Sequence, residues 1–222
     1  MSGPGFRMAV WLPVCAMAFA RPSWGQESGS ARWRLTGAWL AVGPNAPFLT
    51  RLGTRHHDLY VLGLRAERAL VGHGALQLYH TVDALPLAVS TAMPVRYDEG
   101  TCAGAAPQDS TQATCLQWVP HFGTVYGLGL APVGLELRYA AHRRLRIVAS
   151  AAVGALYFTQ RIPDPMASRL NFSITGNVGV QIAPGSHRAI DVGYRFQHVS
   201  NGGIAFNPGM NTHMLQVGLG VR

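Results

Sequence analysis

The feature that most constrains the fold of this chain is an alternation of apolar and polar residues with a period of two. Leu170, Phe172 and Ile174, for example, alternate with Asn171 and Ser173. Successive side chains of a β-strand point to opposite faces, so the pattern predicts a strand with one apolar and one polar face. Repeated segments of this kind predict an all-β protein. We expect its strands near 31–43, 56–67, 72–90, 121–140, 145–158, 170–182, 188–199 and 210–221.

The connections between these expected strands alternate in length. Brief turns are expected near 68–71, 141–144 and 183–187, and longer connections near 44–55, 91–120, 159–169 and 200–209. An even number of strands, joined by short turns at one end and long loops at the other, is typical of outer-membrane barrels. The sequence therefore predicts an eight-stranded antiparallel transmembrane β-barrel with up-and-down meander topology. A secreted lipocalin-like barrel is the main alternative, because a soluble sheet shows the same alternation.

The N-terminal residues indicate export. Arg7 precedes an apolar stretch over residues 8–20, and the small residues Ser23 and Gly25 follow. This order is typical of a secretory signal peptide, which we expect to comprise residues 1–25. The apolar stretch is too short for a membrane-spanning helix. Residues 26–222 are then expected to form a single outer-membrane barrel domain.

Export also bears on the cysteines and on the charge. Without the signal peptide the chain keeps Cys102 and Cys115, which we expect to form a disulfide in an oxidising compartment. The formal net charge is +8, but lysine is absent and the arginines are scattered rather than clustered. Nucleic acid is therefore not an expected partner. An anionic lipid or glycolipid surface agrees better with an exported basic chain.

An eight-stranded barrel has an interior just wide enough for side chains to fill, which predicts a packed lumen and not a pore. We expect the polar residues of this lumen to include Glu136, Arg138, Asn171, Asn177, Asp191 and Arg195. Large aromatic residues are expected to anchor the barrel at the membrane interfaces. This set comprises Trp33, Trp39, Tyr60 and Tyr126.

Two polar residues extend the apolar face of a strand near the C-terminus. The even positions from Ile190 to Phe196 are apolar, and the same parity assigns His198 and Ser200 to their face. Residues i and i+2 of a strand project to the same side, so His198 is placed to act as general base for the Ser200 hydroxyl. Parity in the next strand assigns Asn211 to this face, across from His198. The arrangement predicts acyl transfer to water, and the alternative is an ordinary polar start of a loop.

The segment that follows supplies hydrogen-bond donors. The side-chain amides of Asn201 and Asn207 and the backbone amides of Gly202 and Gly203 are candidates to stabilise a developing oxyanion. The sequence has neither a His-Glu-x-x-His nor a Cys-x-x-Cys spacing. We therefore expect no metal site, and we expect no cofactor.

A family resemblance is carried by the stretch YRFQHVSN at residues 194–201 and by NPG at 207–209. Both resemble the C-terminal motif of the lipid A 3-O-deacylase (PagL-like) outer-membrane family, also called acyloxyacyl hydrolases. The resemblance implies a barrel that hydrolyses the acyl chain ester-linked at the 3-position of lipid A. It also implies a lipid-facing triad of Ser, His and an acid, with Ser200 as nucleophile and His198 as base. The implied partner is lipid A or lipopolysaccharide in the outer leaflet of the bacterial outer membrane.

The implied triad departs from the family at its acid, because Asn211 occupies the position that matches the family's Glu. An amide can orient an imidazole, as in Cys-His-Asn proteases, but it cannot neutralise the imidazolium that forms. Slow hydrolysis, an acid from elsewhere such as Asp164, and loss of catalysis are the open alternatives. His213 is a further candidate to hold His198. The alternative functions are a non-catalytic barrel that binds lipopolysaccharide and a secreted lipid carrier.

Overall fold

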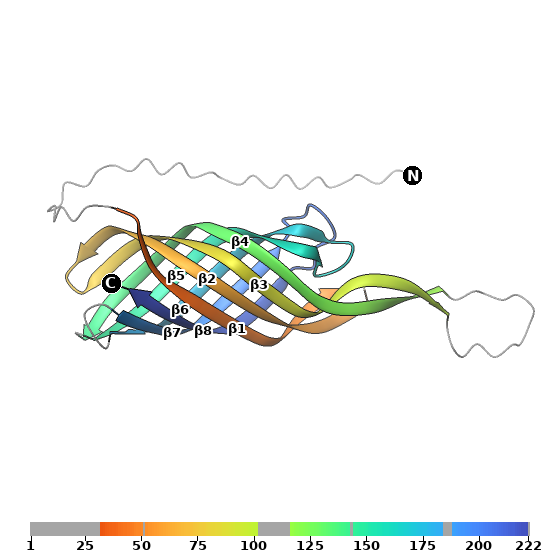
Figure 1. Ribbon diagram of the computed structural model, residues 1–222, viewed down its shortest axis with the longest axis horizontal. Helices are drawn as coiled ribbons and strands as arrows, with labels where there is room; N and C mark the ends of the chain where they lie inside the picture. Colours follow the sequence, from red (N-terminus) through yellow and green to blue (C-terminus); the bar gives the residue numbers. More distant parts are fainter. Residues whose placement is uncertain (1–31, 51, 102–115, 143, 184–187, 222) are drawn as a thin grey trace, which may run out of the picture. The chain divides into compact units, whose positions relative to one another are not determined.

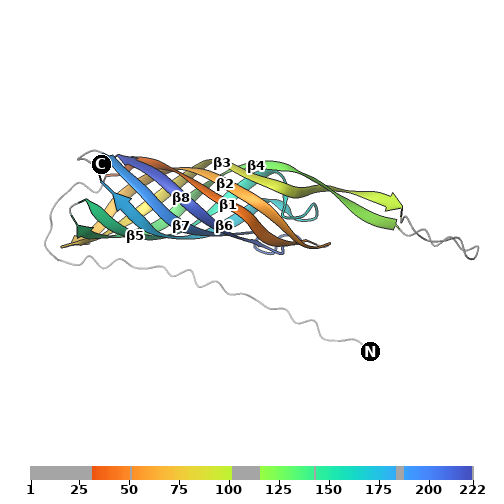
Figure 2. The same cartoon turned by 90° about the horizontal axis from the view of Figure 1, so that it is seen from below.

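The protein is a closed antiparallel barrel of eight β-strands joined in chain order (Figures 1 and 2), which confirms the predicted fold class. The structure is a computed structural model that describes residues 32–50, 52–101, 116–142, 144–183 and 188–221. No helix among these residues is long and apolar enough to cross a membrane. The strands are β1 (Arg34–Thr50), β2 (Gly53–His73), β3 (Leu76–Thr101), β4 (Leu116–His142), β5 (Leu145–Ile162), β6 (Ser168–Ile182), β7 (Arg188–Ser200) and β8 (Met210–Val221).

The barrel closes where β1 pairs with β8. Their register runs from Gly37 opposite Gly220 to Val42 opposite Leu215. Because the number of strands is even, β1 begins and β8 ends at the same end of the barrel. We call this the terminal end, and we call the opposite end, where residues 201–209 connect β7 to β8, the loop end.

The side chains of β8 show how the wall is built. Thr212, Met214 and Gln216 are buried, whereas the intervening Leu215 and Val217 are exposed on the outside. An exterior of exposed apolar side chains around a filled interior is the arrangement of a membrane barrel. It contradicts the secreted lipocalin-like alternative, because a soluble carrier keeps its apolar surface inside.

The connection predicted over residues 44–55 is wrong, because β1 continues to Thr50 and β2 begins at Gly53. Pro44 and Asn45 favour a loop in the sequence. In the structure they lie at an irregularity in the register of β1, where Asn45 has a positive φ of 53°. A β-bulge accommodates proline because the local ladder is already interrupted.

β3 and β4 likewise continue into the connection predicted over residues 91–120. Residues 93–101 pair with residues 116–123, beyond the last pairs that β3 forms with β2 and β4 forms with β5 (Figure 1). This two-stranded extension tolerates proline because one edge of each strand is unpaired. The predicted disulfide between Cys102 and Cys115 lies outside the described residues, as does the predicted signal peptide.

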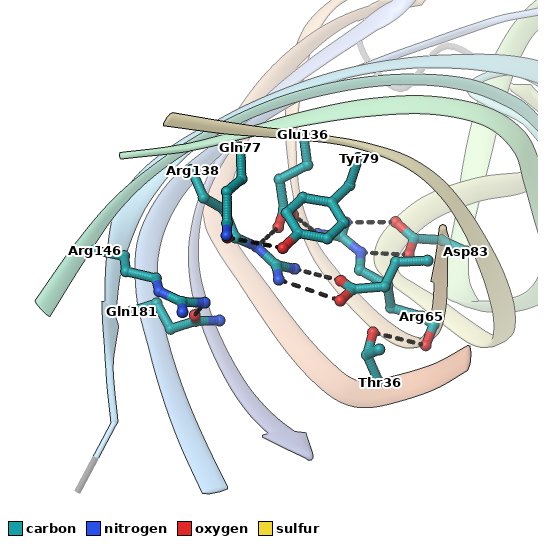
Figure 3. Close-up of polar contacts among 10 residues, drawn as sticks. Thr36, Arg65, Gln77, Tyr79, Asp83, Glu136, Arg138, Arg146 and Gln181 are labelled. Carbon is teal, nitrogen blue, oxygen red and sulfur yellow. Dashed lines mark hydrogen bonds and ion pairs between the residues drawn. The ribbon is translucent and has the colours of Figure 1, made fainter. Parts of the chain in front are cut away.

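Charged side chains form a network in the half of the interior nearer the terminal end (Figure 3). Arg65 donates to both carboxylate oxygens of Asp83 at 2.8 Å and also to Glu136. Arg138 donates to Glu136 at 2.6 Å and to Glu67 at 3.2 Å. Each charge of this network therefore has at least one partner of opposite sign, which offsets the cost of removing it from water.

The half of the interior nearer the loop end contains an apolar cluster that the sequence analysis did not predict. Leu59, Leu156, Phe158, Val199 and Met210 belong to one buried cluster there. The six predicted lumen residues nevertheless lie inside: Glu136, Arg138, Asn171 and Arg195 are buried, and Asn177 and Asp191 are half-buried. The prediction therefore holds for these positions and misses the apolar cluster.

Trp39 is also placed differently from the prediction, because it lies inside the barrel and not at an interface. Only 4% of its surface is exposed, and the Arg195 guanidinium lies 4.1 Å from the centre of its ring. Gly63, opposite Trp39 on β2, makes room for the indole, since a Cβ at Gly63 would lie 2.1 Å from it. Trp33 and Tyr126, by contrast, are exposed.

Replacing Glu136 with alanine is expected to destabilise the barrel, because Arg65 and Arg138 lose their shared buried partner. Loss of one member of a buried ion pair costs about 3–5 kcal/mol. We expect a decrease of this size in the free energy of unfolding, measured by urea titration in lipid vesicles. The control is Asp98→Ala, which breaks exposed pairs with Arg96 and His121 and should cost less than about 1 kcal/mol. Equal losses in the two variants would contradict a stabilising role for the network.

Candidate active site

The last residues of β7 place two polar side chains on the outer wall. Gln197 and Val199 are buried, whereas His198 and Ser200 are half-buried on the opposite, outward side. Two residues along an antiparallel strand span about 7 Å, so these side chains are neighbours on one face. Among the described residues, no hydrogen bond joins the His198 ring to the Ser200 hydroxyl. Catalytic contacts of this kind are often long without substrate and shorten when it binds.

Asn211 on β8 contacts the His198 ring directly. The two residues are paired across the strands, and Asn211 Oδ1 lies 2.7 Å from His198 Nδ1. An amide oxygen can only accept, so Nδ1 carries the proton and donates it. The neutral ring then leaves Nε2 as a proton acceptor, which is the tautomer that a general base needs.

Gly209 is a residue of this site that the sequence pattern does not identify. It adopts a φ of 67°, and a Cβ at this position would lie 3.1 Å from His198 Cε1. Both observations favour glycine, because it enters the left-handed region without strain and leaves room for the ring. The available signal is its place in an Asn-Pro-Gly sequence, which is typical of a turn.

The connection from β7 to β8 is held by two asparagine side chains. Asn201 is fully buried: its Oδ1 accepts a hydrogen bond from the Gly203 amide at 3.1 Å, and its Nδ2 donates to the Phe206 carbonyl at 3.4 Å. Asn207 Oδ1 accepts from the Gly209 amide at 3.1 Å. The Asn201 side chain and the Gly203 amide, both expected at an oxyanion, are therefore engaged within the connection itself.

The other two expected donors have no such engagement. Within the described part of the chain, the Gly202 amide and Asn207 Nδ2 have no hydrogen-bond partner. Gly202 has a φ of 65° and packs over Phe172, where a Cβ would lie 3.1 Å from the ring. Phe172 is the cross-strand neighbour of Ser200. The Gly202 amide is thus held close to the serine at the rim of the barrel.

The other residues considered as partners of His198 are bound elsewhere. Asp164 is buried and accepts a hydrogen bond from the Tyr97 hydroxyl at 2.6 Å. His213 Nδ1 is hydrogen-bonded to the Tyr194 hydroxyl. Of the residues considered, Asn211 is therefore the one whose side chain holds the His198 ring. Across the described ranges, no three His, Cys, Asp or Glu side chains are grouped in a way that could hold a metal ion.

A closed barrel of eight antiparallel strands with an apolar exterior defines the outer-membrane class of barrel proteins. A family model described as "Lipid A 3-O-deacylase (PagL)" matches residues 95–220, which contain the whole site. The match covers more than half of the chain, so the chain belongs to this family. The resemblance seen in the sequence is thereby confirmed. No curated protein matches the chain.

The chain is also similar to several solved structures. The chain is similar to the outer membrane enzyme PagL with 19% identity and a TM-score of 0.52, over 82% of this chain and 97% of that one. Its identity to Neisserial surface protein A is 11%, with a TM-score of 0.46, over 86% of this chain and 98% of that one. Its identity to the attachment invasion locus protein Ail of Yersinia pestis is 9%, with a TM-score of 0.41, over 84% of this chain and 96% of that one. The similarity to the PagL structure supports the fold alone.

Asn201→Ala is expected to loosen the connection between β7 and β8, because it removes the contacts to Gly203 and Phe206. A typical hydrogen bond contributes about 1 kcal/mol, so hydrogen exchange at the Gly203 amide should become about fivefold faster. NMR spectroscopy in detergent micelles measures this rate. Asn201→Asp is the matched control, since it keeps an acceptor for Gly203. The assigned role fails if both variants exchange at the same rate.

Proposed function

We propose that this protein is an outer-membrane esterase that hydrolyses the 3-O-linked acyl chain of lipid A at the outer wall of its barrel. The observation that carries the proposal is the contact between Asn211 Oδ1 and His198 Nδ1, next to Ser200 on one outward face. This contact sets the ring in the tautomer that a serine nucleophile requires. Membership of the lipid A 3-O-deacylase family supports the choice of substrate.

In the proposed reaction, the Ser200 hydroxyl attacks the ester carbonyl and passes its proton to His198 Nε2. The imidazolium gives this proton to the sugar oxygen as the C–O bond breaks, which leaves an acyl-serine. A water molecule, deprotonated by the same ring, then releases the fatty acid and restores Ser200. Asn211 holds Nδ1–H in place through both steps.

The Gly202 amide and Asn207 Nδ2 are the donors that we assign to the oxyanion. Both lie in the connection after Ser200, and neither is engaged within it. Removing one oxyanion donor from a serine hydrolase raises the barrier by about 2.7–4 kcal/mol. Asn201 and Gly203 instead shape the connection that presents these donors.

The proposed setting is the outer leaflet of the bacterial outer membrane, where lipopolysaccharide is the partner. Phe172 and Ile174 are exposed on the wall beside the site and provide apolar contacts for acyl chains. A net charge of +8 favours a phosphorylated glycolipid surface. We propose export by the signal peptide 1–25 and a disulfide between Cys102 and Cys115 in the mature protein.

Ser200→Ala and His198→Ala are each expected to abolish deacylation and to leave the barrel folded, because neither side chain packs in the interior. Purified protein is incubated with lipid A, and mass spectrometry detects the loss of one 3-hydroxyacyl chain. Heat-modifiable gel mobility reports folding. Ser90→Ala, which changes a buried serine on β3, is the control and should retain the rate. An active Ser200→Ala protein would exclude Ser200 as nucleophile.

Asn211→Ala is expected to slow the reaction, because the His198 ring loses its orienting partner. Asn211→Asp should match or exceed the parent rate, since a carboxylate also stabilises the imidazolium. Loss of the orienting acid in a serine protease costs about 10⁴-fold, which leaves room for a measurable gain. Initial rates on lipid A near neutral pH test this series. If all three proteins hydrolyse at one rate, position 211 has no catalytic role.

A non-catalytic barrel that binds lipopolysaccharide is the second candidate function. Asn211 favours it, because an amide cannot neutralise the imidazolium that catalysis creates. The mass spectrometry assay separates the two candidates. Lipid A that co-purifies with the parent protein and stays unmodified would support binding and exclude the esterase.

A further inference from the structure

Three side chains form a cluster on the first three strands, in the half of the barrel nearer the terminal end. Trp33 directly precedes β1, and Arg68 on β2 is paired with His80 on β3. Arg68 Cζ lies over the Trp33 ring, 5.5 Å from its centre. The His80 ring meets the same indole edge to face, with 4.9 Å between the ring centres. We call these three residues the Trp33 cluster.

The alternation of side chains along β2 and β3 directs Arg68 and His80 to the outside of the barrel. Their neighbours in sequence lie inside, since Glu67 accepts a hydrogen bond from Arg138 and Thr81 is buried. Successive side chains of a strand point to opposite faces, so Arg68 and His80 belong to the outer wall. The Trp33 cluster is therefore on the surface that faces lipid.

Arg68 places a positive charge in an apolar stretch of this wall. Leu64 and Leu70, which precede and follow it on β2, are exposed. Among the described residues, the Arg68 guanidinium has no carboxylate partner and no hydrogen bond, whereas Arg65 and Arg138 in the interior both bond with carboxylates. A charge on the lipid face is costly unless it is compensated. Arg68 therefore favours an anion from outside the described part of the chain.

The donors of the Trp33 cluster match a phosphate group. A guanidinium presents its N–H groups in a planar fork, which binds phosphate oxygens in a bidentate manner. Stacking against Trp33 covers one face of the Arg68 guanidinium and leaves the N–H groups at its edge able to donate. The indole has one N–H donor, and the His80 imidazole has one in either neutral tautomer. Three donor groups thus surround one positive charge.

The position of the Trp33 cluster favours a lipid as the source of the phosphate. In outer-membrane barrels the short turns lie on the periplasmic side. At the terminal end, residues 74 and 75 alone join β2 to β3, so the cluster belongs to the half of the wall that faces the inner leaflet. Phospholipids form this leaflet, and each carries its phosphate above acyl chains that can contact exposed leucines.

We propose that the Trp33 cluster binds the phosphate group of a phospholipid in the inner leaflet of the outer membrane. Arg68 pairs with two phosphate oxygens, Trp33 holds the guanidinium plane, and His80 donates a further hydrogen bond. Leu64 contacts an acyl chain of the same lipid. The site lies on β1 to β3, away from the esterase proposed on β7 and β8, and does not depend on that function.

Arg68→Gln tests the proposal, because it removes the charge and the planar fork. Native mass spectrometry of the protein in detergent micelles measures the Kd of dioleoylphosphatidylglycerol and of dioleoylglycerol, which has the same acyl chains without phosphate. Hydrogen bonds to charged groups change an affinity by about tenfold or more. We expect the parent to bind the phospholipid more tightly by this factor, and Arg68→Gln to lose the difference. Arg188→Gln, which removes an exposed arginine at the same end, is the control and should keep it.

Three outcomes would overturn the proposal. A parent that binds both lipids equally has no phosphate site. Equal losses in Arg68→Gln and Arg188→Gln would show attraction to the overall charge alone. Displacement of the phospholipid by inorganic phosphate at the same concentration would show a site for the free ion. Heat-modifiable gel mobility reports folding, and if Arg68→Gln does not fold, Arg68→Lys keeps the charge, loses the planar fork and is judged by the same difference.

Discussion

The pairing of β1 with β8 is the interaction on which the rest of this structure depends. In hydrocarbon, each unpaired backbone group of a strand edge costs several kilocalories per mole, so a spanning sheet must close on itself. The register from Gly37 with Gly220 to Val42 with Leu215 removes both edges. A Cβ at Gly37 would lie 2.4 Å from the Leu219 carbonyl oxygen, so glycine permits the close approach at this seam. Closure makes the outer wall a fixed surface on which side chains can be positioned.

Polar side chains on such a wall need partners, and β7 and β8 provide them in two neighbouring pairs. His198 bonds with Asn211, and Tyr194 bonds with His213. Each pair joins β7 to β8, so the pairing register of these two strands positions both hydrogen bonds. A polar group in an apolar environment is costly unless it is hydrogen-bonded. The hydrogen bond that satisfies the His198 ring therefore also orients it. The same contact stabilises the wall and positions the ring for the proposed chemistry.

Strand number, topology and the outward face of the β7 end could be predicted, because side-chain direction alternates by local geometry alone. The position of Asn211 opposite His198 followed from the same parity in the next strand. The ends of the strands were harder to predict. Pro44 favours a loop in the sequence but lies at a β-bulge of β1, and the turn expected near 68–71 lies at residues 74–75. The role of the Asn201 side chain could not be predicted, because its hydrogen bonds reach backbone atoms whose positions depend on the folded connection.

Val199 and Met210 lie inside the wall, each next in sequence to a residue of the proposed site, and both belong to the apolar cluster. These apolar side chains lie between the reacting groups of the proposed site and the charged half of the lumen. In the proposed reaction, the water that cleaves the acyl-serine therefore comes from the head-group layer. The proposed turnover consumes water at the cell surface without drawing it through the protein.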